Sequence, residues 1–339
     1  MKTSLFLGTA VAAALTAGVA GAQTLEEVRE RGVLNCGINT GLAGFASPDD
    51  EGEWEGFDVA YCRALAAAVL GDPMAIEFVT LTGQTRFTAL ASGQIDVLSR
   101  NTTWTFTRDN DLQFEFVGVN YYDGQGFIVP ADLGVSSAMD LNGATVCIQT
   151  GTTTELNLAD FFRVNEMDYE PVPIETNAEA RQQYLAGACD TYTTDTSGLA
   201  ASRATFEDPS AHTILPEVIS KEPLGPVVRH GDNLWGDIAR WTLNALIAAE
   251  EYGVTAANVE ELAANGTDNP EINRMLGLEG GFGEVLGLSN DWAVQAIKAE
   301  GNYGEIFARY IGEETDIGLS RGLNAQYTEG GLMYAPPFR

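Results

Sequence analysis

The sequence predicts an α/β protein built from two similar halves. Two passages carry this prediction, because each has an apolar helix end, a glycine, an aspartate, a short strand and then hydroxyl residues. The first passage, residues 90–108, ends in Arg108, and the second, residues 185–195, ends in Asp195. Alternating strands and helices are typical of a largely parallel sheet, whose ligands bind beyond the carboxyl ends of the strands. A cleft between the halves would offer a cation from one side and an anion from the other, which suits a zwitterion.

The first half begins with a short helix over residues 25–31 and a strand over 33–38. After a polar loop, Gly56-Phe57-Asp58 begins a helix with one apolar face, and Gly71-Asp72-Pro73 ends it. The other elements expected in this half are strands over 76–81 and 95–98 and a helix over 86–91.

The second half repeats the alternation. We expect strands over 144–148 and 189–192, a helix that begins in Gly151-Thr152-Thr153-Thr154-Glu155, and a helix over 177–185. The β-prone segments 124–130 and 222–228 are expected to cross between the halves and form a hinge. A long amphipathic helix over 233–252 follows, and the Gly-rich tail is expected to pack on the first lobe. The expected lobe bounds are 23–125 with 226–339 for lobe 1 and 126–225 for lobe 2.

The first 22 residues have the pattern of a secretory signal peptide. Lys2 precedes an apolar run over residues 5–19, and Ala20-Gly21-Ala22 fits the rule for a cleavage site. The run has about 15 residues, fewer than the roughly 20 that span a membrane. We therefore expect a free periplasmic protein without membrane insertion.

The cysteine count agrees with an exported chain. Four cysteines allow three pairings, and we favour Cys36–Cys62 and Cys147–Cys189, because each pair then lies within one half. Each bond would add about 3–4 kcal/mol on the chain-entropy account. The alternative is four buried thiols. We expect no metal and no cofactor, because there is no CxxC motif and His212 and His230 lack the spacing of metal ligands.

Charge and motifs exclude several functions. The formal net charge of −30 disfavours nucleic acid and anionic lipid as partners. The sequence has no GxSxG, HExxH or Walker A motif, so no catalytic centre is expected.

Arg108 and the threonines before it are candidates for a carboxylate site. A guanidinium group offers a planar fork of donors that matches a carboxylate. The hydroxyl of Thr103 could assist, and the indole of Trp104 could cover an apolar side chain. The alternatives are a surface ion pair of Arg108 with Asp109 or Asp111 and a tryptophan in the core.

The second half has its own candidates. Thr152 and Glu155 fit a capping box, and the helix N-terminus that they mark favours an anion near Thr153. Asp195 could pair with an ammonium group or could cap the following helix. Asn39, at the end of the first strand, could face the same cleft.

The chain resembles the family 3 extracellular solute-binding proteins of polar amino-acid ABC transporters. The matching residues in family order are Gly56-Phe57-Asp58-Val59, Arg86-Phe87 to Gly93 and Asp96, Arg108 and Gly151-Thr152-Thr153. Four further segments resemble the general L-amino-acid-binding subgroup: residues 99–105, 192–195, 215–226 and 334–337. The resemblance implies a type II periplasmic-binding-protein fold, in which two α/β lobes are joined by two hinge crossings.

The resemblance also implies roles for single residues. Arg108 would clamp the α-carboxylate of an L-amino acid, with help from Thr103 and Thr153. Asp195 would hold the α-ammonium group, with polar groups around Asn101 assisting. Asn39 and the neighbourhood of Leu42 and Phe45 would border the side-chain pocket. Leu42 replaces an aromatic residue that is frequent in relatives, and Asn39 replaces the aspartate of many binders of basic amino acids.

The implied function is a periplasmic protein that captures L-amino acids of several side-chain types. It would deliver them to the membrane-embedded permease subunits of an ABC transporter. The pocket with little fixed charge fits this breadth. An alternative is a periplasmic dehydratase of cyclic amino acids on the same scaffold, and a third is a ligand sensor that docks on a receptor.

Overall fold

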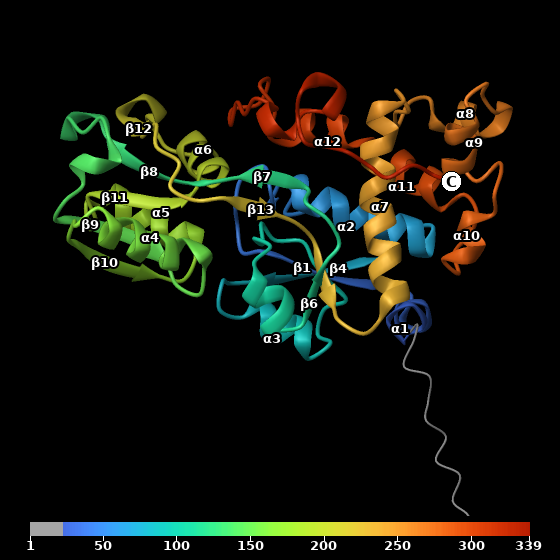
Figure 1. Cartoon of the computed structure of the whole chain (residues 1–339), viewed down its shortest axis with the longest axis horizontal. Coiled ribbons are helices and arrows are strands. Elements are labelled where there is room, and N and C mark those ends of the chain that lie inside the picture. Colours follow the sequence, from blue (N-terminus) through green and yellow to red (C-terminus); the bar gives the residue numbers. More distant parts are fainter. Residues whose placement is uncertain (1–22) are drawn as a thin grey trace, which may run out of the picture.

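The computed structural model describes residues 23–339, and the expected signal peptide, residues 1–22, lies outside the described residues. Two five-stranded sheets form the centres of two lobes, which lie beside each other along the long axis of the molecule (Figure 1). The protein therefore has the bilobal α/β architecture that its sequence predicts.

The sheet of lobe 1 has the strand order β4-β1-β5-β14-β6. Its first three strands are parallel, and β14 runs antiparallel to both of its neighbours. The strands are β1 (Leu34–Asn39), β4 (Ile76–Leu81), β5 (Val97–Leu98), β6 (Phe114–Phe116) and β14 (Val227–Arg229). The helices that accompany this sheet are α1 (Gln23–Arg31), α2 (Phe57–Leu70), α3 (Arg86–Ala91) and α7 (Asn233–Glu251). A short hairpin, β2 (Ser47–Pro48) with β3 (Trp54–Glu55), precedes α2.

The sheet of lobe 2 follows the same plan, in the order β10-β9-β11-β8-β12. Three parallel strands are again followed by an antiparallel fourth strand. The strands are β8 (Gln125–Pro130), β9 (Ala144–Gln149), β10 (Tyr169–Ile174), β11 (Thr191–Asp195) and β12 (His212–Ile214). The helices are α4 (Thr153–Val164), α5 (Asn177–Leu185) and α6 (Thr196–Ala204).

The aspartate of each repeated Gly-x-x-Asp passage has the same structural role in its lobe. Asp96 exchanges hydrogen bonds with Asn35 of β1, because the Asn35 N–H donates to the Asp96 carboxylate at 2.8 Å and the Asp96 N–H donates to the Asn35 carbonyl at 2.9 Å. Asp190 makes the same two bonds with Thr145 of β9, at 2.8 and 2.9 Å. Each aspartate therefore fixes the start of its own strand to the neighbouring parallel strand, β1 in lobe 1 and β9 in lobe 2.

Two antiparallel strands connect the lobes, β7 (Tyr121–Asp123) and β13 (Glu222–Leu224). The segment 124–130, expected to be the first crossing, instead forms β8 inside the sheet of lobe 2. The crossing occurs just before it, in β7, because the chain from residue 125 onwards pairs with β11. Both crossing strands lie between the lobes in Figure 1.

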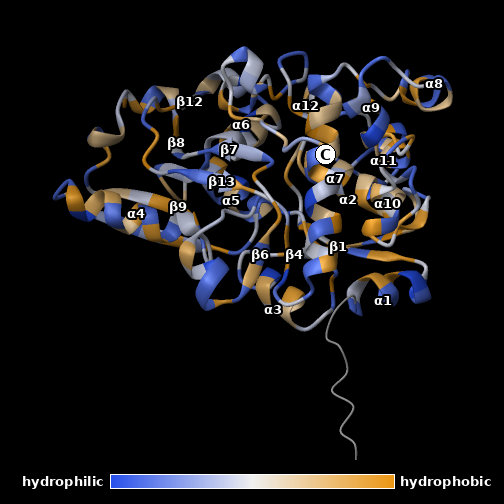
Figure 2. Cartoon of the chain, turned by 45° about the vertical axis from the view of Figure 1, so that its right-hand side comes forward, coloured by the Kyte–Doolittle hydropathy of each residue, from blue (hydrophilic) through white to orange (hydrophobic). Residues whose placement is uncertain are grey.

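The tail packs on lobe 1, where it extends the core around α2 and α7. Its helices are α8 (Val259–Asn265), α9 (Pro270–Met275), α10 (Phe282–Val285), α11 (Trp292–Glu300) and α12 (Tyr303–Tyr310). Figure 2 shows polar and apolar residues alternating around α7, whose apolar side lies in this core. Gly71 adopts a left-handed conformation with φ of 74° and ends α2, as Gly does at many helix C-termini.

Both disulfides of the structure lie within one lobe. Cys36 of β1 is joined to Cys62 of α2, and Cys147 of β9 is joined to Cys189. Each bond ties a central strand of its sheet to another part of the same lobe. The disulfides therefore strengthen the lobes without restricting movement between them.

Candidate binding site between the lobes

A small cavity lies where the two lobes face each other. Its volume is about 20 Å³, room for roughly one water molecule. A larger ligand can enter only after the lobes separate or the lining side chains move. The lining residues from lobe 1 are Arg86, Arg100, Asn101 and Thr103, and those from lobe 2 are Gln149, Thr152, Thr153, Thr154, Thr194 and Asp195.

A chain of polar contacts crosses this cavity. The side-chain amide of Asn39 donates to the Asn101 side chain at 3.1 Å, and the Asn101 amide donates to Asp195 at 3.3 Å. Asn101 and Asp195 line the cavity, whereas Asn39 lies one contact behind it. The carboxyl ends of β1 and β11 therefore face each other through Asn101.

Asp195 is the residue before α6, but it does not cap that helix. The carboxylate of Asp123 in β7 caps α6 instead. It accepts hydrogen bonds from the Thr196 hydroxyl at 2.6 Å and from the Ser197 hydroxyl and N–H at 2.5 and 3.3 Å. Burial, followed by repulsion from Asp123 and Glu222, raises the pKa of Asp195 well above its ordinary value. An ammonium group beside Asp195 would oppose this effect.

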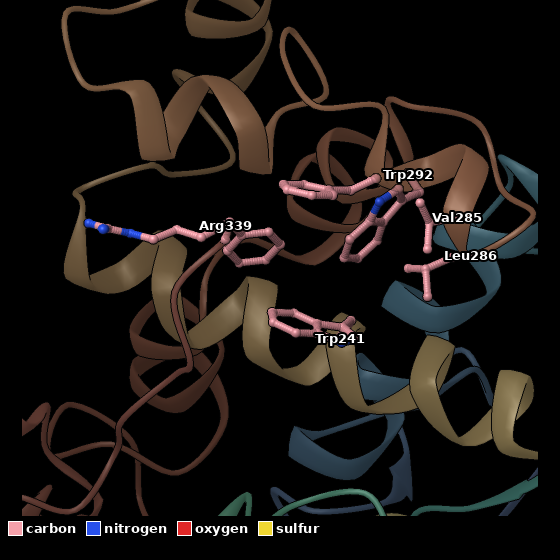
Figure 3. Close-up of a pocket in the computed structure, with 7 residues that line it drawn as sticks. Trp241, Val285, Leu286, Trp292 and Arg339 are labelled. Carbon is pink, nitrogen blue, oxygen red and sulfur yellow. The ribbon is translucent and has the colours of Figure 1, made fainter.

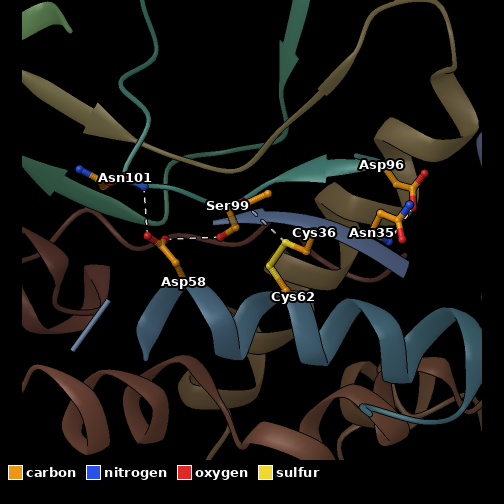
Figure 4. Close-up of a disulfide and its surroundings, with 8 residues drawn as sticks. Asn35, Cys36, Asp58, Cys62, Asp96, Ser99 and Asn101 are labelled. Carbon is orange, nitrogen blue, oxygen red and sulfur yellow. Dashed lines mark hydrogen bonds between the residues drawn. A yellow bond between two sulfur atoms is a disulfide. The ribbon is translucent and has the colours of Figure 1, made fainter. Parts of the chain in front are cut away.

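Asp58, at the start of α2, holds the backbone of Asn101. Its carboxylate accepts from the Asn101 N–H at 3.0 Å and from the Ser99 hydroxyl at 3.4 Å (Figure 4). Asn101 has φ of 30°, an unusual value that Asn tolerates better than most residues. Burial raises the pKa of Asp58 to about 6, although the Asn101 hydrogen bond and the charge of Arg100 lower it.

We expect Asp58→Asn to remove a pH-dependent part of the stability of lobe 1. Because the folded-state pKa is raised above the ordinary 3.8, the Asp58 contribution is most favourable below pH 3.8 and is lost as pH rises through about 6. The free energy of unfolding of the variant, relative to wild type, should therefore increase by about 3 kcal/mol between pH 4 and pH 7.5. Denaturant unfolding at several pH values measures this difference. Asp50→Asn, at an exposed position, should show no such trend, and a flat difference for Asp58→Asn would contradict the prediction.

Arg108 lies in a single π-helical turn, Thr107–Asp111, and only 7% of its surface is exposed. π-Helical turns occur frequently at functional sites. The guanidinium Nη1 donates to the carbonyl of Thr103 at 2.8 Å and the group lies 5.1 Å from the centre of the Phe87 ring. It makes no other side-chain hydrogen bond within residues 23–339. Arg108 is therefore buried directly behind the lining residue Thr103, and the alternative of a surface ion pair with Asp109 or Asp111 is not found.

Arg86 lines the cavity. From the sequence it was recognised only as part of the family pattern and not as a candidate binding residue. It is 2% exposed, and its two hydrogen bonds within residues 23–339 are long, at 3.3 Å to the Thr102 hydroxyl and 3.5 Å to the Gly151 carbonyl. Its Nε atom has no partner among these residues. Burial lowers the pKa of Arg86 well below its usual value, and the charges of Arg108 and Arg100 lower it further. An anion or another acceptor at this place would stabilise the Arg86 guanidinium.

Three other expected contacts lie away from the cavity. The Trp104 ring stacks on Phe116 at 5.5 Å, and its Nε1 donates to Asp109 at 2.7 Å. Phe45 is buried in the core of lobe 1, where Leu42 also lies. None of the three is a lining residue.

A second pocket, of about 270 Å³, lies in the tail region and is apolar. Trp241 of α7 faces Trp292 and Leu286 across it (Figure 3). No residue of the interlobe cavity contributes to this pocket. Within residues 23–339, no cluster of three or more His, Cys, Asp or Glu side chains could hold a metal ion. In the same part of the chain, no helix combines the length and apolar character needed to cross a membrane.

The chain matches known proteins over its whole length. The sequence pattern of the bacterial extracellular solute-binding proteins, family 3, covers residues 34–313. The chain is 65% identical to the glutamate/glutamine/aspartate/asparagine-binding protein of Rhodobacter capsulatus and 54% identical to the general L-amino acid-binding periplasmic protein of Rhizobium johnstonii, with 100% of every chain covered. A solved periplasmic binding protein from Brucella ovis, with glutathione bound, has a TM-score of 0.90 and 55% identity, and the match covers 93% of this chain and 99% of that one.

Proposed function

The chain belongs to the bacterial extracellular solute-binding proteins of family 3, and on this basis we propose that it captures one L-amino acid between its lobes. It acts in the periplasm and delivers the amino acid to the membrane subunits of an ABC transporter. The observation that carries this proposal is the interlobe cavity, where Asp195 of lobe 2 faces the guanidinium groups of lobe 1. Its close relatives have the names of binding proteins, which favours capture over the dehydratase alternative.

The α-amino and α-carboxyl groups have separate proposed partners. Asp195 holds the ammonium group with Asn101, because both line the cavity and touch each other. Arg108 holds the carboxylate with backbone N–H groups of the first turn of α4, near Thr153. In this proposal Trp104 and Phe45 do not contact the bound amino acid. We also keep the division into two lobes, with boundaries near residues 125 and 225.

We further propose that Arg86 selects side chains that end in a carbonyl or carboxylate oxygen. Arg86 is a buried donor without a good acceptor, so a ligand oxygen would satisfy it. Glutamate, glutamine, aspartate and asparagine, which name the relative from Rhodobacter, all have such an oxygen. Glutathione, bound by the relative from Brucella, contains a γ-glutamyl group with a carbonyl at the same position as that of glutamine.

Calorimetric titration of the mature protein with each of the twenty amino acids tests the function. The four acidic and amide amino acids should bind more tightly than alanine, and lysine and arginine should bind most weakly, because Arg86 and Arg100 line the cavity. Failure of all twenty to bind would contradict the proposed function. Tight binding of lysine alone would contradict the role of Arg86 only.

Arg86→Met should abolish the preference for these side chains. The variant keeps most of the apolar volume of the arginine and removes its donors, so the affinity for glutamate and glutamine should fall by about 10- to 100-fold, while the affinity for alanine changes little. The ratio of the dissociation constants of glutamate and alanine is the quantity to measure.

Gln84→Ala is the matched control for this ratio. Gln84 makes a 2.9 Å hydrogen bond to Thr150 of lobe 2, so its loss weakens closure without removing a lining residue. The control should change both affinities together. An unchanged ratio in Arg86→Met would show that Arg86 does not contact the side chain.

A further inference from the structure

Glu222 is a buried carboxylate at the point where the chain returns from lobe 2 to lobe 1. It is the first residue of β13, lies opposite Asp123 of β7, and is 1% exposed. A buried carboxylate is stable only when donors surround it. The identity of these donors indicates what Glu222 does.

Four side chains donate to the Glu222 carboxylate. The Oε2 atom accepts from the hydroxyls of Thr103 at 2.5 Å and Thr153 at 2.9 Å. The Oε1 atom accepts from the Asn157 amide at 2.6 Å and the Ser220 hydroxyl at 2.7 Å. Thr103 follows β5 in lobe 1, whereas Thr153 and Asn157 lie on α4 in lobe 2. One carboxylate on the hinge therefore binds both lobes at once.

These bonds also determine which atoms the threonines offer to the cavity. A hydroxyl group has one proton, and both Thr103 and Thr153 give theirs to Glu222. Their Oγ1 atoms, 3.2 Å apart, then have only lone pairs left for other partners. In this arrangement the two hydroxyls can accept a hydrogen bond from a ligand but cannot donate one to its carboxylate.

We propose that Glu222 is a positioning residue that holds the two lobes closed and orients Thr103 and Thr153 as acceptors. It acts through the threonines, since it is not among the residues that line the cavity. The closed arrangement is thereby populated before any ligand binds. The carboxylate of an amino acid is left to Arg108 and to backbone N–H groups, and the hydroxyls are available to its ammonium group. The coupling of the lobes by Glu222 does not depend on which ligand is bound.

The distance between the lobes in the ligand-free protein tests this proposal. Spin labels can be attached after Met74→Cys in lobe 1 and Val164→Cys in lobe 2, because both positions are exposed (59% and 74%) and all four native cysteines are in disulfides. Pulsed electron paramagnetic resonance measures the distance between the two labels. For the wild type it should give mainly the short distance that corresponds to closed lobes. In Glu222→Ala most molecules should move to a longer distance, and a saturating amino acid should restore the short one.

Three further variants make the result specific. Glu222→Gln keeps an acceptor oxygen and should restore part of the short-distance population. Glu217→Ala is the matched control and should leave the distances unchanged. Among the described residues, the carboxylate of Glu217 accepts hydrogen bonds only from Ser137 and Ala138, which lie in the same lobe. Asn157→Ala removes one donor from lobe 2 and should shift the distances in the same direction as Glu222→Ala, which keeps the test valid if Glu222→Ala does not fold.

Two results would overturn the proposal. One is a ligand-free distance distribution that is the same in wild type, Glu222→Ala and Asn157→Ala. The other is an equal shift in Glu217→Ala, which would make the effect a general loss of acidic residues. Neither result depends on amino-acid binding, so the proposed function can fail or hold separately.

Discussion

Arg108→Ala is expected to abolish amino-acid binding while changing the thermal unfolding temperature little. Removal of one partner from a buried charge pair costs about 3–5 kcal/mol, which corresponds to two to four orders of magnitude in Kd. The folded protein depends less on this arginine, since its one side-chain hydrogen bond within the described residues goes to the Thr103 carbonyl. Its loss also removes repulsion from Arg86, which partly offsets the lost contact with Phe87.

Calorimetry with glutamate and glutamine, together with thermal unfolding without ligand, measures both parts of this prediction. Arg163→Ala is the control, because the Arg163 side chain is 75% exposed on α4 and, within residues 23–339, pairs only with Asp160. The control should bind as the wild type does. Binding by Arg108→Ala within about tenfold of wild type would show that this guanidinium does not hold the carboxylate, since it corresponds to no more than about 1.4 kcal/mol.

The repeated helices and strands could be predicted because local sequence signals determine where they begin and end. Gly71 adopts a left-handed conformation that ends α2, and the Thr152 hydroxyl accepts the Glu155 N–H at the start of α4. Asp96 and Asp190, noticed first as a repeated pattern, prove to make equivalent bonds in the two lobes. Each of these signals acts within a few residues or within one lobe.

Elements without such a signal were missed. Strand β10 contains Pro171 and Pro173, which argue against a strand in the middle of a sheet. In the part of the chain that the structure describes, the strand lies at the edge of the sheet and pairs only with β9, so the missing N–H groups face away from the ladder. The position of an edge depends on the whole sheet order, which no short passage of sequence contains.

The site shows the same limit. Asp195 is the last residue of β11 and Thr153 follows β9, so both lie where ligands of parallel sheets are expected, and both line the cavity. Arg86 gives no such signal, because its neighbours indicate only a helix start, and its contact with the Gly151 carbonyl of lobe 2 is seen only in the folded chain. Glu222 acquires its four donors from segments up to 119 residues away along the chain. Residues whose role depends on the meeting of two lobes cannot be recognised from one of them.

Asp195→Asn is expected to weaken amino-acid binding by about 100-fold or more and to remove its pH dependence. The weakening follows from the loss of the charge that would face the ligand ammonium group. In the wild type, burial and the repulsion from Asp123 and Glu222 hold the pKa of Asp195 high without ligand. A bound ammonium group lowers this pKa, so binding releases a proton and affinity must rise with pH until Asp195 is ionised in the free protein.

Titrations at several pH values, in buffers with different heats of ionisation, count the protons released. The wild type should release protons on binding as long as the pH lies below the raised pKa of free Asp195, whereas Asp195→Asn should release fewer and show a flatter dependence of Kd on pH. Asp160→Asn, on the exposed surface of α4, should match the wild type. If Asp195→Asn kept both the affinity and the pH slope of the wild type, the ammonium group would have to bind elsewhere. Asp123 could not replace Asp195, because its carboxylate is occupied by the start of α6.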